Sequence, residues 1–287
     1  MDILETRELR YFVAVADELH FGRAAERLGI AQPPLSRAIQ QLERRLGVTL
    51  LERNRRGVSL TGAGEILLQE GRAALDATAA AVRRTRRAGG AGSTGGARDR
   101  LVLAVKAGAF HELLDKLLDA YAAEPGAAGI EVLPSGMCEQ DGMLRDGRAD
   151  VALMHTPFNS LAGFDSVELM TEEQVAILPA KHPLAARKTL SLAELSDVPD
   201  LPLARWPRHD TYPPGPGPEV HDQTQLAQLI ALGRTMTVFP ESARTWLWEE
   251  HAAVPLSDAP PVTTHIVWPA HSRSRALAGL VRTASRL

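Results

Sequence analysis

Residues 89–96 read Gly-Gly-Ala-Gly-Ser-Thr-Gly-Gly, a composition that favours neither helix nor strand and is typical of a flexible linker. The pattern of apolar residues differs on its two sides. Before the linker, apolar residues recur with the helical period, and after it short apolar runs alternate with helical stretches. The sequence therefore predicts two or three folding units of different class within 287 residues.

The segment that precedes the linker begins with a predicted helix over residues 6–19. Leu9, Phe12 and Ala16 fall on one of its faces, which is the pattern of a helix that packs against a core. Thr6 is the expected N-cap, because a threonine hydroxyl can accept a hydrogen bond from a free backbone N–H of the first turn.

Two further helices follow with a tight turn between them. The shorter spans about residues 23–28 and is expected to end at Gly29, and the longer begins near Gln32 and ends before Gly47. Apolar side chains share one face of the longer helix, so polar side chains occupy the other. Two helices joined by a tight turn, the second with an exposed polar face, form the helix-turn-helix arrangement that enters the major groove of DNA.

A hairpin is predicted directly after the helix-turn-helix. Residues 50–53 and 58–60 favour strands, and Asn54-Arg55-Arg56-Gly57 favours the turn between them. A basic hairpin at this place is typical of the wing of a winged helix.

A long alanine-rich helix is predicted from Thr61, its N-cap, to about Arg87. Leu68, Leu75 and Val82 recur every seven residues, which is the spacing of a seam between two helices. Such a stripe can pack on its own domain or on a second copy of the chain. Because the winged helix before it is already complete, we expect dimerisation through these three residues.

The segment after the linker alternates strands with helices, which predicts an α/β domain with largely parallel sheets. A proline-rich stretch over residues 206–218 fits neither pattern. Strands are expected over residues 101–105, 130–133, 151–154 and 236–239, and helices after the first strand, over residues 223–232 and from Arg273.

The charge of the chain is unevenly distributed. Residues 1–100 contain 17 arginines against 12 acidic residues, a net charge of +5, whereas the whole chain carries −3. A basic N-terminal segment on an acidic remainder suits a nucleic-acid-binding module fused to a domain of another function. No apolar run approaches the roughly 18 residues that span a bilayer and no leader opens the chain, so a cytoplasmic location without membrane contact is expected.

An ordered series of motifs runs through the chain. It is densest at residues 9–16 (LRYFVAVA), 21–28 (FGRAAERL) and 32–39 (QPPLSRAI), and it continues more loosely as far as residues 147–153 (GRADVAL) and 238–240. By these motifs the chain resembles the LysR-type transcriptional regulators, closely to about residue 65 and moderately beyond. The family commonly has hydroxyl side chains at the positions of Gly22 and Ala31, where this chain has none.

The resemblance implies a mixed α and α/β fold. A winged helix-turn-helix would be followed by a dimerising linker helix, a hinge and a periplasmic-binding-protein-like effector domain of two α/β lobes. We assign the winged helix to residues 1–62, the linker helix to 63–88, the flexible hinge to 89–98 and the effector-binding domain to 99–287. Its first lobe is expected over about residues 99–172 and 267–287, and its second over about 173–266.

The implied function is sequence-specific transcription regulation under the control of a small-molecule effector bound between the lobes. Expected partners are double-stranded DNA, the effector and further copies of the chain in a homodimer or homotetramer, with RNA polymerase as a partner if the protein is an activator. Dimerisation would place two recognition helices about 34 Å apart, on the half-sites of an interrupted palindrome.

Ten residues are predicted to contact DNA. Arginine pairs with guanine and glutamine with adenine, serine is a flexible donor, and proline can meet a thymine methyl. Arginines of the hairpin would hold the backbone or enter a minor groove, and one of them can instead brace the wing. An exposed polar helix face is often only solvated, but the order of the motifs favours DNA contact. The predicted residues are Arg23, Gln32, Pro33, Pro34, Ser36, Arg37, Gln40, Arg53, Arg55 and Arg56.

The ends of the predicted strands supply candidates for the effector site, because crevices in α/β domains bind ligands there. A lysine and the free N–H groups of helix N-termini suit a carboxylate or another anion. Each candidate can equally serve as a hydrogen-bond partner in a loop or as a helix cap. The candidates are Lys106, Gly108, Ser135, Gly136, His155, Thr156, Gln223 and Thr224.

The sequence gives little support to other chemistry. Cys138 is the single cysteine, the histidines lack the spacing of metal ligands, and the nucleophile-elbow, P-loop and dinucleotide motifs are absent. We therefore predict no enzyme activity, no cofactor and no metal. Two alternatives stay open: a cytoplasmic solute-binding module whose winged helix serves only oligomerisation, and a catalytic α/β protein fused to a winged helix.

Overall fold

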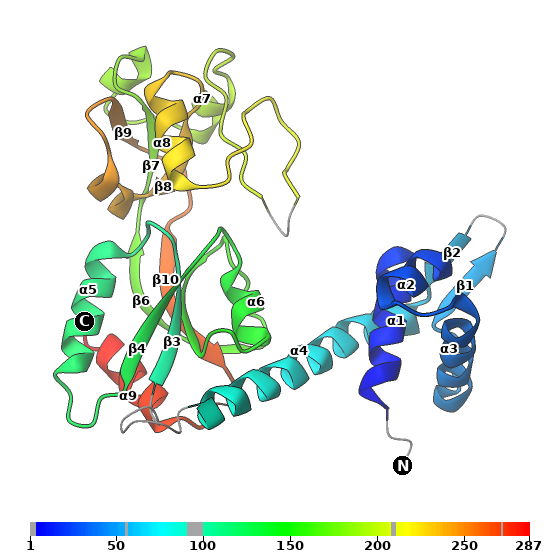
Figure 1. The fold of residues 1–287 in the computed structure, drawn as a ribbon. Coiled ribbons are helices and arrows are strands. Elements are labelled where there is room, and N and C mark those ends of the chain that lie inside the picture. Colours follow the sequence, from blue (N-terminus) through cyan, green and yellow to red (C-terminus); the bar gives the residue numbers. More distant parts are fainter. Residues whose placement is uncertain (1–3, 55–56, 91–99, 208–210, 271) are drawn as a thin grey trace. The chain divides into compact units, whose positions relative to one another are not determined.

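The computed structural model describes residues 4–54, 57–90, 100–207, 211–270 and 272–287. They form two compact units, the first comprising Met1–Arg87 with Arg145–Gly147 and the second Ala88–Leu144 with Arg148–Leu287. Each unit has its own hydrophobic core, and Figure 1 colours both along the sequence.

The N-terminal unit is a small helical core with a hairpin and a long helix. Its hairpin is antiparallel and pairs Leu51 with Leu60. The elements are α1 (Thr6–Glu18), α2 (Phe21–Leu28), α3 (Gln32–Leu46), β1 (Leu51–Asn54), β2 (Gly57–Leu60) and α4 (Gly62–Gly90).

The core of this unit lies between α1, α2 and α3. Phe12 of α1 and Leu35, Ile39 and Leu42 of α3 are fully buried. These residues confirm the centre of the apolar stripe predicted for each helix. Burial of each such side chain contributes about 1.5–3 kcal/mol relative to exposure. Leu19 and Leu46, which the same spacing places at the ends of these stripes, are 45% and 39% exposed instead.

The helix ends agree with the sequence at three places and differ at one. Gly29 ends α2 in the left-handed conformation, prolines occupy the first turn of α3, and the Thr61 hydroxyl accepts from the backbone N–H of Gly64 at the start of α4 (3.0 Å). The prediction of Thr6 as the N-cap of α1 is wrong. Glu5 is the N-cap, because its side chain and that of Glu8 reciprocally satisfy the free N–H groups of the first turn.

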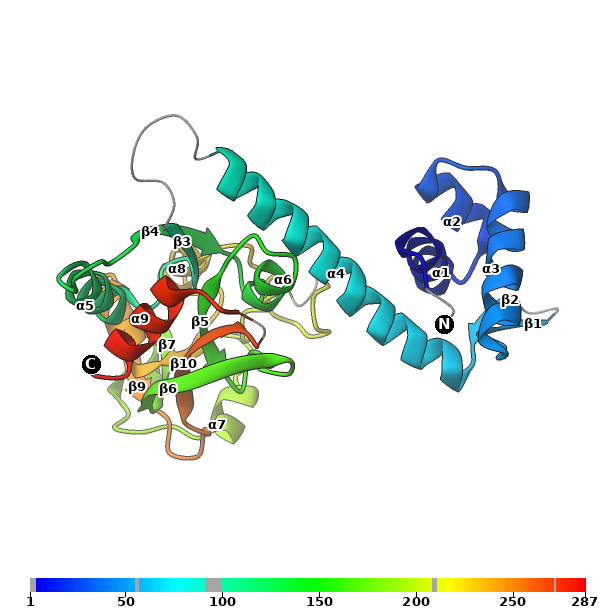
Figure 2. The same cartoon turned by 90° about the horizontal axis from the view of Figure 1, so that it is seen from below.

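The C-terminal unit has two lobes, and the first is built on a sheet of order β4-β3-β5-β10-β6. Helices α5 (His111–Ala122) and α9 (Arg275–Ala284) lie side by side on one face, and α6 (Gln140–Arg145) covers the other, as Figure 2 shows from below. The strands are β3 (Arg100–Lys106), β4 (Gly129–Ser135), β5 (Val151–Thr156), β6 (Phe164–Glu172) and β10 (Val262–Pro269).

The second lobe is built on a smaller sheet of order β8-β7-β9. Buried apolar residues lie on both of its faces, where short helices pack. Its elements are β7 (Gln174–Pro179), the 3-10 helix η1 (Pro183–Ala186), α7 (Leu192–Ser196), α8 (Gln223–Ala231), β8 (Thr237–Pro240), the 3-10 helix η2 (Glu241–Trp246) and β9 (His251–Pro255).

The prediction of largely parallel sheets holds only for β3, β4 and β5. Strand β10 is antiparallel to β5 and β6, and the strands of the second lobe pair antiparallel. The chain leaves the first lobe after β6 and returns along β10, so β10 must run in the opposite direction to β6. Because β10 begins at Val262, the return predicted at about residue 267 falls inside this strand.

Arg205 binds the described residues 211–218 of the proline-rich stretch. The Arg205 guanidinium donates to the carbonyl oxygens of Gly217 (2.6 Å) and Pro213 (3.0 Å) and pairs with Glu219 (3.1 Å). Proline has no N–H to form a sheet ladder, so these side-chain bonds replace regular secondary structure here.

Within the described ranges, no helix is both long enough and apolar enough to cross a membrane.

Candidate DNA interface and effector cavity

Helix α3 presents the polar face that the sequence predicted. Gln32, Pro33, Pro34, Arg37 and Gln40 are exposed, and Ser36 is partly exposed, opposite the buried face of the same helix. In the part of the chain that the structure describes, no hydrogen bond or ion pair engages the Arg37 guanidinium. The face is therefore free to donate hydrogen bonds to a partner.

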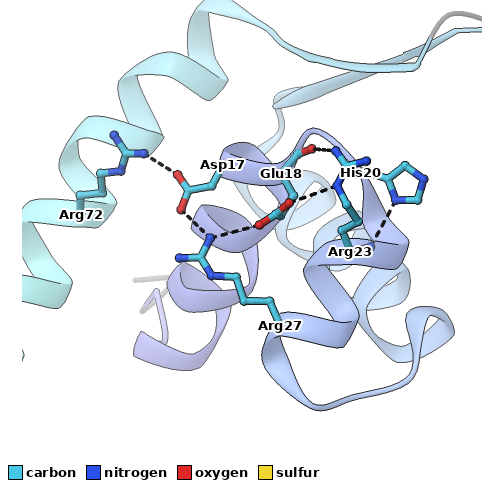
Figure 3. A network of polar contacts seen from close by, with 6 residues as sticks. All are labelled: Asp17, Glu18, His20, Arg23, Arg27 and Arg72. Carbon is cyan, nitrogen blue, oxygen red and sulfur yellow. Dashed lines mark hydrogen bonds and ion pairs between the residues drawn. The ribbon is translucent and has the colours of Figure 1, made fainter. Parts of the chain in front are cut away.

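Arg23 differs from Arg37, because it is bonded within the domain (Figure 3). Its Nε pairs with Glu18 Oε2 (3.2 Å), and its Nη2 donates to the Glu18 carbonyl (2.6 Å) near the end of α1. Asp17 accepts from Arg27 of α2 (3.1 Å) and also from Arg72 of α4. This network ties the end of α1 to both α2 and α4.

Helix α4 packs on α1 at its N-terminal end. A Cβ atom at Gly71 would lie 3.2 Å from Leu9 Cδ2, so the two helices approach closely there. Leu68 also packs against the core of this unit, whereas Leu75 is partly exposed and Val82 is 45% exposed. Leu68 is therefore partly covered within its own unit, and dimerisation through Leu68, Leu75 and Val82 stays a prediction.

Helix α2 is capped by a residue that the sequence did not single out. The His20 Nδ1 accepts hydrogen bonds from the backbone N–H groups of Gly22 (3.1 Å) and Arg23 (3.2 Å). Only a neutral imidazole has a free acceptor nitrogen. A Cβ atom at Gly22 would lie 2.9 Å from His20 Cε1, so the glycine makes room for the ring. By contrast, Ala31 at the N-cap of α3 makes no side-chain cap.

We expect His20→Ala to destabilise the N-terminal unit by about 1 kcal/mol, the usual loss for an N-cap. Gly22→Thr should cost a similar amount by displacing the ring, and His20→Ser combined with Gly22→Thr should recover most of it. Urea denaturation followed by circular dichroism at 222 nm measures His20→Ala and the cycle formed by the wild type, His20→Ser, Gly22→Thr and the double variant. Strictly additive losses would show that the two residues are not coupled.

The wing is present as β1 and β2, but the residues predicted to contact DNA from it are not described. Arg55 and Arg56 lie outside the described residues, and so does the side chain of Arg53.

A larger and a smaller cavity lie between the two lobes of the C-terminal unit. The larger measures about 300 Å³ and extends over α5, β6 and η2. The smaller measures about 140 Å³ and includes Trp206 of the proline-rich stretch. Residues shared by the two walls are Lys106, Phe110, His155, Phe239 and Pro240.

Lys106 is the cation at the junction of the cavities. Its Nζ lies 4.3 Å from the ring centre of Phe239 and 5.6 Å from that of Trp206. Burial lowers its pKa to about 8. Among the described residues no carboxylate forms an ion pair with it. A buried ammonium without a counter-ion favours an anion as its missing partner.

Three further polar atoms at the smaller cavity are buried without a hydrogen-bond partner among the described residues. They are His155 Nε2, Gln140 Oε1 and Trp206 Nε1. Burial, with the charge of Lys106 and the neighbouring His265, lowers the pKa of His155 to about 3. His155 is therefore neutral at physiological pH, and its ring lies 4.4 Å from that of Phe110.

Gln223 and Gly108 bring the lobes together beside the larger cavity. With its amide oriented to satisfy both atoms, Gln223 donates to the Ala107 carbonyl (3.3 Å) and accepts from Trp246 Nε1 (3.0 Å). A Cβ atom at Gly108 would lie 1.9 Å from the nearer terminal atom of the Gln223 amide. Gly108 thus leaves the space that Gln223 needs to reach across.

The other predicted effector residues have mixed positions. Ser135 and Gly136 line a shallower cavity with Lys106, and the Ser135 hydroxyl donates to Val105 (3.0 Å). Thr156 bonds to His265 Nε2 (3.0 Å), and Thr224 is exposed. Neither threonine is among the residues that line these described cavities. Residues of the walls that the sequence did not suggest include Phe110, Gln140, Trp206, Phe239 and Trp246.

A helix-turn-helix with a wing, followed by a two-lobed α/β domain with a cavity between its lobes, defines a transcription regulator that couples DNA binding to a ligand. Residues 6–65 match the model of the bacterial regulatory helix-turn-helix protein, lysR family, and residues 94–286 match that of the LysR substrate binding domain. The chain belongs to the LysR family of transcriptional regulators.

Individual proteins show the same likeness along most of the chain. The regulator AlsR of Bacillus subtilis is 32% identical over 84% of this chain and 82% of its own length. IlvR of Caulobacter vibrioides is 34% identical over 97% of both chains. The crystal structure of full-length CbnR in complex with its target DNA superposes with a TM-score of 0.52 and 27% identity, over 99% of each chain. The chain is therefore a regulator and not an enzyme.

Proposed function

We propose that this regulator binds an interrupted palindromic operator through the α3 faces of a homo-oligomer, and that a small anionic effector between its lobes controls this binding. The observation that carries the proposal is the face of α3. It has exposed Gln32, Arg37 and Gln40 opposite fully buried Leu35 and Ile39. Side chains of these types donate to base edges in the major groove.

The remaining DNA contacts belong to the same proposal. Pro33, Pro34 and Ser36 would meet thymine methyls or phosphates at the start of α3, and Arg53, Arg55 and Arg56 would hold the backbone from the wing. Arg23 is a candidate phosphate contact, because 59% of its side chain is exposed although it is paired with Glu18.

Oligomerisation would involve the part of the predicted stripe that its own unit leaves uncovered. Leu75 and Val82 lie on α4 beyond the contact with α1, and Ile66 is 67% exposed. A homodimer through α4, or a homotetramer built from two such dimers, places paired recognition helices on successive half-sites. Reading chromosomal DNA implies a cytoplasmic protein, and activation would add RNA polymerase as a partner.

The effector would bind at Lys106, whose ammonium has no counter-ion among the described residues. Lys106, Gly108, His155 and Gln223 line the larger cavity, and Ser135 and Gly136 the shallower one beside it. Thr156 and Thr224 would act only through their neighbours. An effector that fits one arrangement of the lobes better than another shifts the population of that arrangement, and with it the spacing of the recognition helices.

Selection of bound sequences from a random duplex library tests the DNA-binding proposal, because the library contains every short operator and none has to be chosen. We expect the full-length protein to enrich an interrupted palindrome whose half-sites are about one helical turn apart or a multiple of it. Enrichment of no motif, with weak binding erased by salt, would instead indicate a winged helix that serves only oligomerisation.

A further inference from the structure

The smaller cavity combines unpaired polar groups with apolar walls. Its wall includes Lys106, whose ammonium lies over the rings of Phe239 and Trp206 and has no hydrogen bond to a described residue. It also includes three residues with a buried polar atom that lacks a hydrogen-bond partner among the described residues, at Trp206 Nε1, His155 Nε2 and Gln140 Oε1. Buried polar groups are normally paired, so each exception calls for an explanation. A bound ligand that accepts hydrogen bonds from several of these groups would explain why they lack protein partners.

The chemistry of these groups favours an oxyanion. The ammonium and the indole N–H can only donate, and a neutral imidazole can donate through Nε2 when its proton lies there. A carboxylate offers two oxygens with about four acceptor sites. It can therefore satisfy Lys106, Trp206 and His155 together.

The charge of the cavity favours a single negative charge. Lys106 is the only cationic residue among those that line the smaller cavity in the described part of the chain. His155 contributes no charge, because burial holds its pKa near 3. The adjoining larger cavity carries the carboxylates of Glu112 and Glu172. A second negative charge on the ligand would find no partner and would be repelled.

The remaining walls favour a flat apolar body. The rings of Phe110, Phe158 and Phe239 line the smaller cavity together with Met137. Its volume of about 140 Å³ is close to that of a cavity of about 150 Å³ that holds one benzene molecule.

We propose that the smaller cavity binds a monocarboxylate whose apolar body is about one six-membered ring in size, with the carboxylate at Lys106 and Trp206 and the ring between Phe110 and Phe239. This rests on the proposed effector site and names the class of molecule that it takes. Trp206 acts as a specificity-determining residue, because its N–H lacks a hydrogen-bond partner among the described residues.

Isothermal titration of the full-length protein with three benzene derivatives of different charge tests this class; benzoate and benzamide share one shape, and phthalate adds a second carboxylate. Benzoate carries one charge, benzamide none and phthalate two. We expect saturable benzoate binding, with benzamide and phthalate each at least tenfold weaker. Equal affinity for benzoate and benzamide, tighter binding of phthalate, or no saturable binding of benzoate up to 10-millimolar concentration would each overturn the proposal.

Matched variants then test whether Lys106 is the cation that binds the carboxylate. Lys106→Met should weaken benzoate binding at least tenfold and leave benzamide unchanged, whereas Lys116→Met should change neither. Lys116 lines the larger cavity and is paired with Glu112, and its replacement removes the same charge. Trp206→Phe should weaken benzoate several-fold while retaining the ring. An equal loss of benzoate affinity in both lysine variants would show a non-specific effect of net charge and would contradict the assignment of the carboxylate to Lys106.

The pH dependence of benzoate binding gives a further test of Lys106, because a residue with a purely structural role would not change it. The Kd for benzoate should be flat below neutrality and rise towards tenfold per pH unit above about 8, as Lys106 loses its proton. Lys106→Met should abolish this rise, and Cys138→Ser should move its onset to lower pH, because Cys138 raises the pKa of Lys106. Other titratable residues lining the cavities that open on Lys106 are His111, Glu112, Lys116, Glu139, His155, Glu172, His221 and Asp222.

Failure of this inference is distinguishable from failure of the proposed function. Titration needs no DNA, and the library selection needs no ligand. A protein that enriches an operator but binds no benzoate keeps the DNA-binding proposal and loses the monocarboxylate.

Discussion

Phe12→Ala should destabilise the N-terminal unit by about 3–5 kcal/mol and abolish DNA binding. Phe12 is fully buried at the centre of the core formed by α1, α2 and α3. Removing the ring costs the transfer free energy of its carbons and leaves a cavity that the three helices can close only in part. Because a domain of this size is stable by only about 5–15 kcal/mol, much of the helix-turn-helix population would unfold.

Two spectroscopic signals separate the two units. All four tryptophans, at positions 206, 246, 248 and 268, lie in the C-terminal unit. In the variant, ellipticity at 222 nm should be lost in an early urea transition while tryptophan fluorescence keeps its wild-type midpoint. Val48→Ala is the matched control, because Val48 is 44% exposed and its truncation should change stability by less than about 0.5 kcal/mol. Coincident early transitions in both signals would contradict independent units.

The sequence predicted the helices and strands because their signals are local. The 3.6-residue period of α1 and α3 follows from which side chains each helix must bury, and Gly29 ends α2 because it accepts φ +66°. The Glu5 cap was missed because Thr6 is the stronger cap by residue type. A reciprocal pair of glutamates satisfies the same N–H groups, and it depends on two side chains acting together.

Two of the predicted effector residues, Thr156 and Thr224, do not line the described cavities, for geometric reasons. His155 and Thr156 are neighbours on β5, and neighbours on a strand point to opposite faces. Gln223 and Thr224 are neighbours on α8, where successive side chains diverge by about 100° around the helix axis. One member of each pair lines the cavity, and the other bonds to His265 or faces solvent.

Contacts between distant segments were beyond local patterns. Arg23 was predicted to contact DNA from its sequence position alone, and its bonds to Glu18 across the turn between α1 and α2 were not foreseen. Trp206 lies in a stretch without periodicity, and its place at the cavity depends on bonds that Arg205 makes to carbonyls several residues away. Burial of an indole beside a lysine is a property of the fold, and neither residue signals it by itself.

Arg37→Ala should weaken binding to the selected operator by about 1–3 kcal/mol, or roughly 5–150-fold, and relax base preference at one position of each half-site. The guanidinium is exposed on α3 and has no partner among the described residues, so its donors are available for the two acceptors of guanine. Arg37→Lys should recover little of the loss, because an ammonium cannot make the same two parallel hydrogen bonds.

Arg44→Ala is the matched control for charge. Arg44 lies on the same helix two turns further along, and its replacement removes one positive charge as Arg37→Ala does. Binding of both variants to the selected operator and to each single-base variant, measured by fluorescence anisotropy over a range of salt, separates the two effects. Loss of one base preference in Arg37→Ala alone assigns base reading to Arg37. An equal loss of affinity for all sequences in both variants, with the same change in salt dependence, would show that Arg37 contacts only phosphate. Base recognition would then be assigned to Gln32 and Gln40.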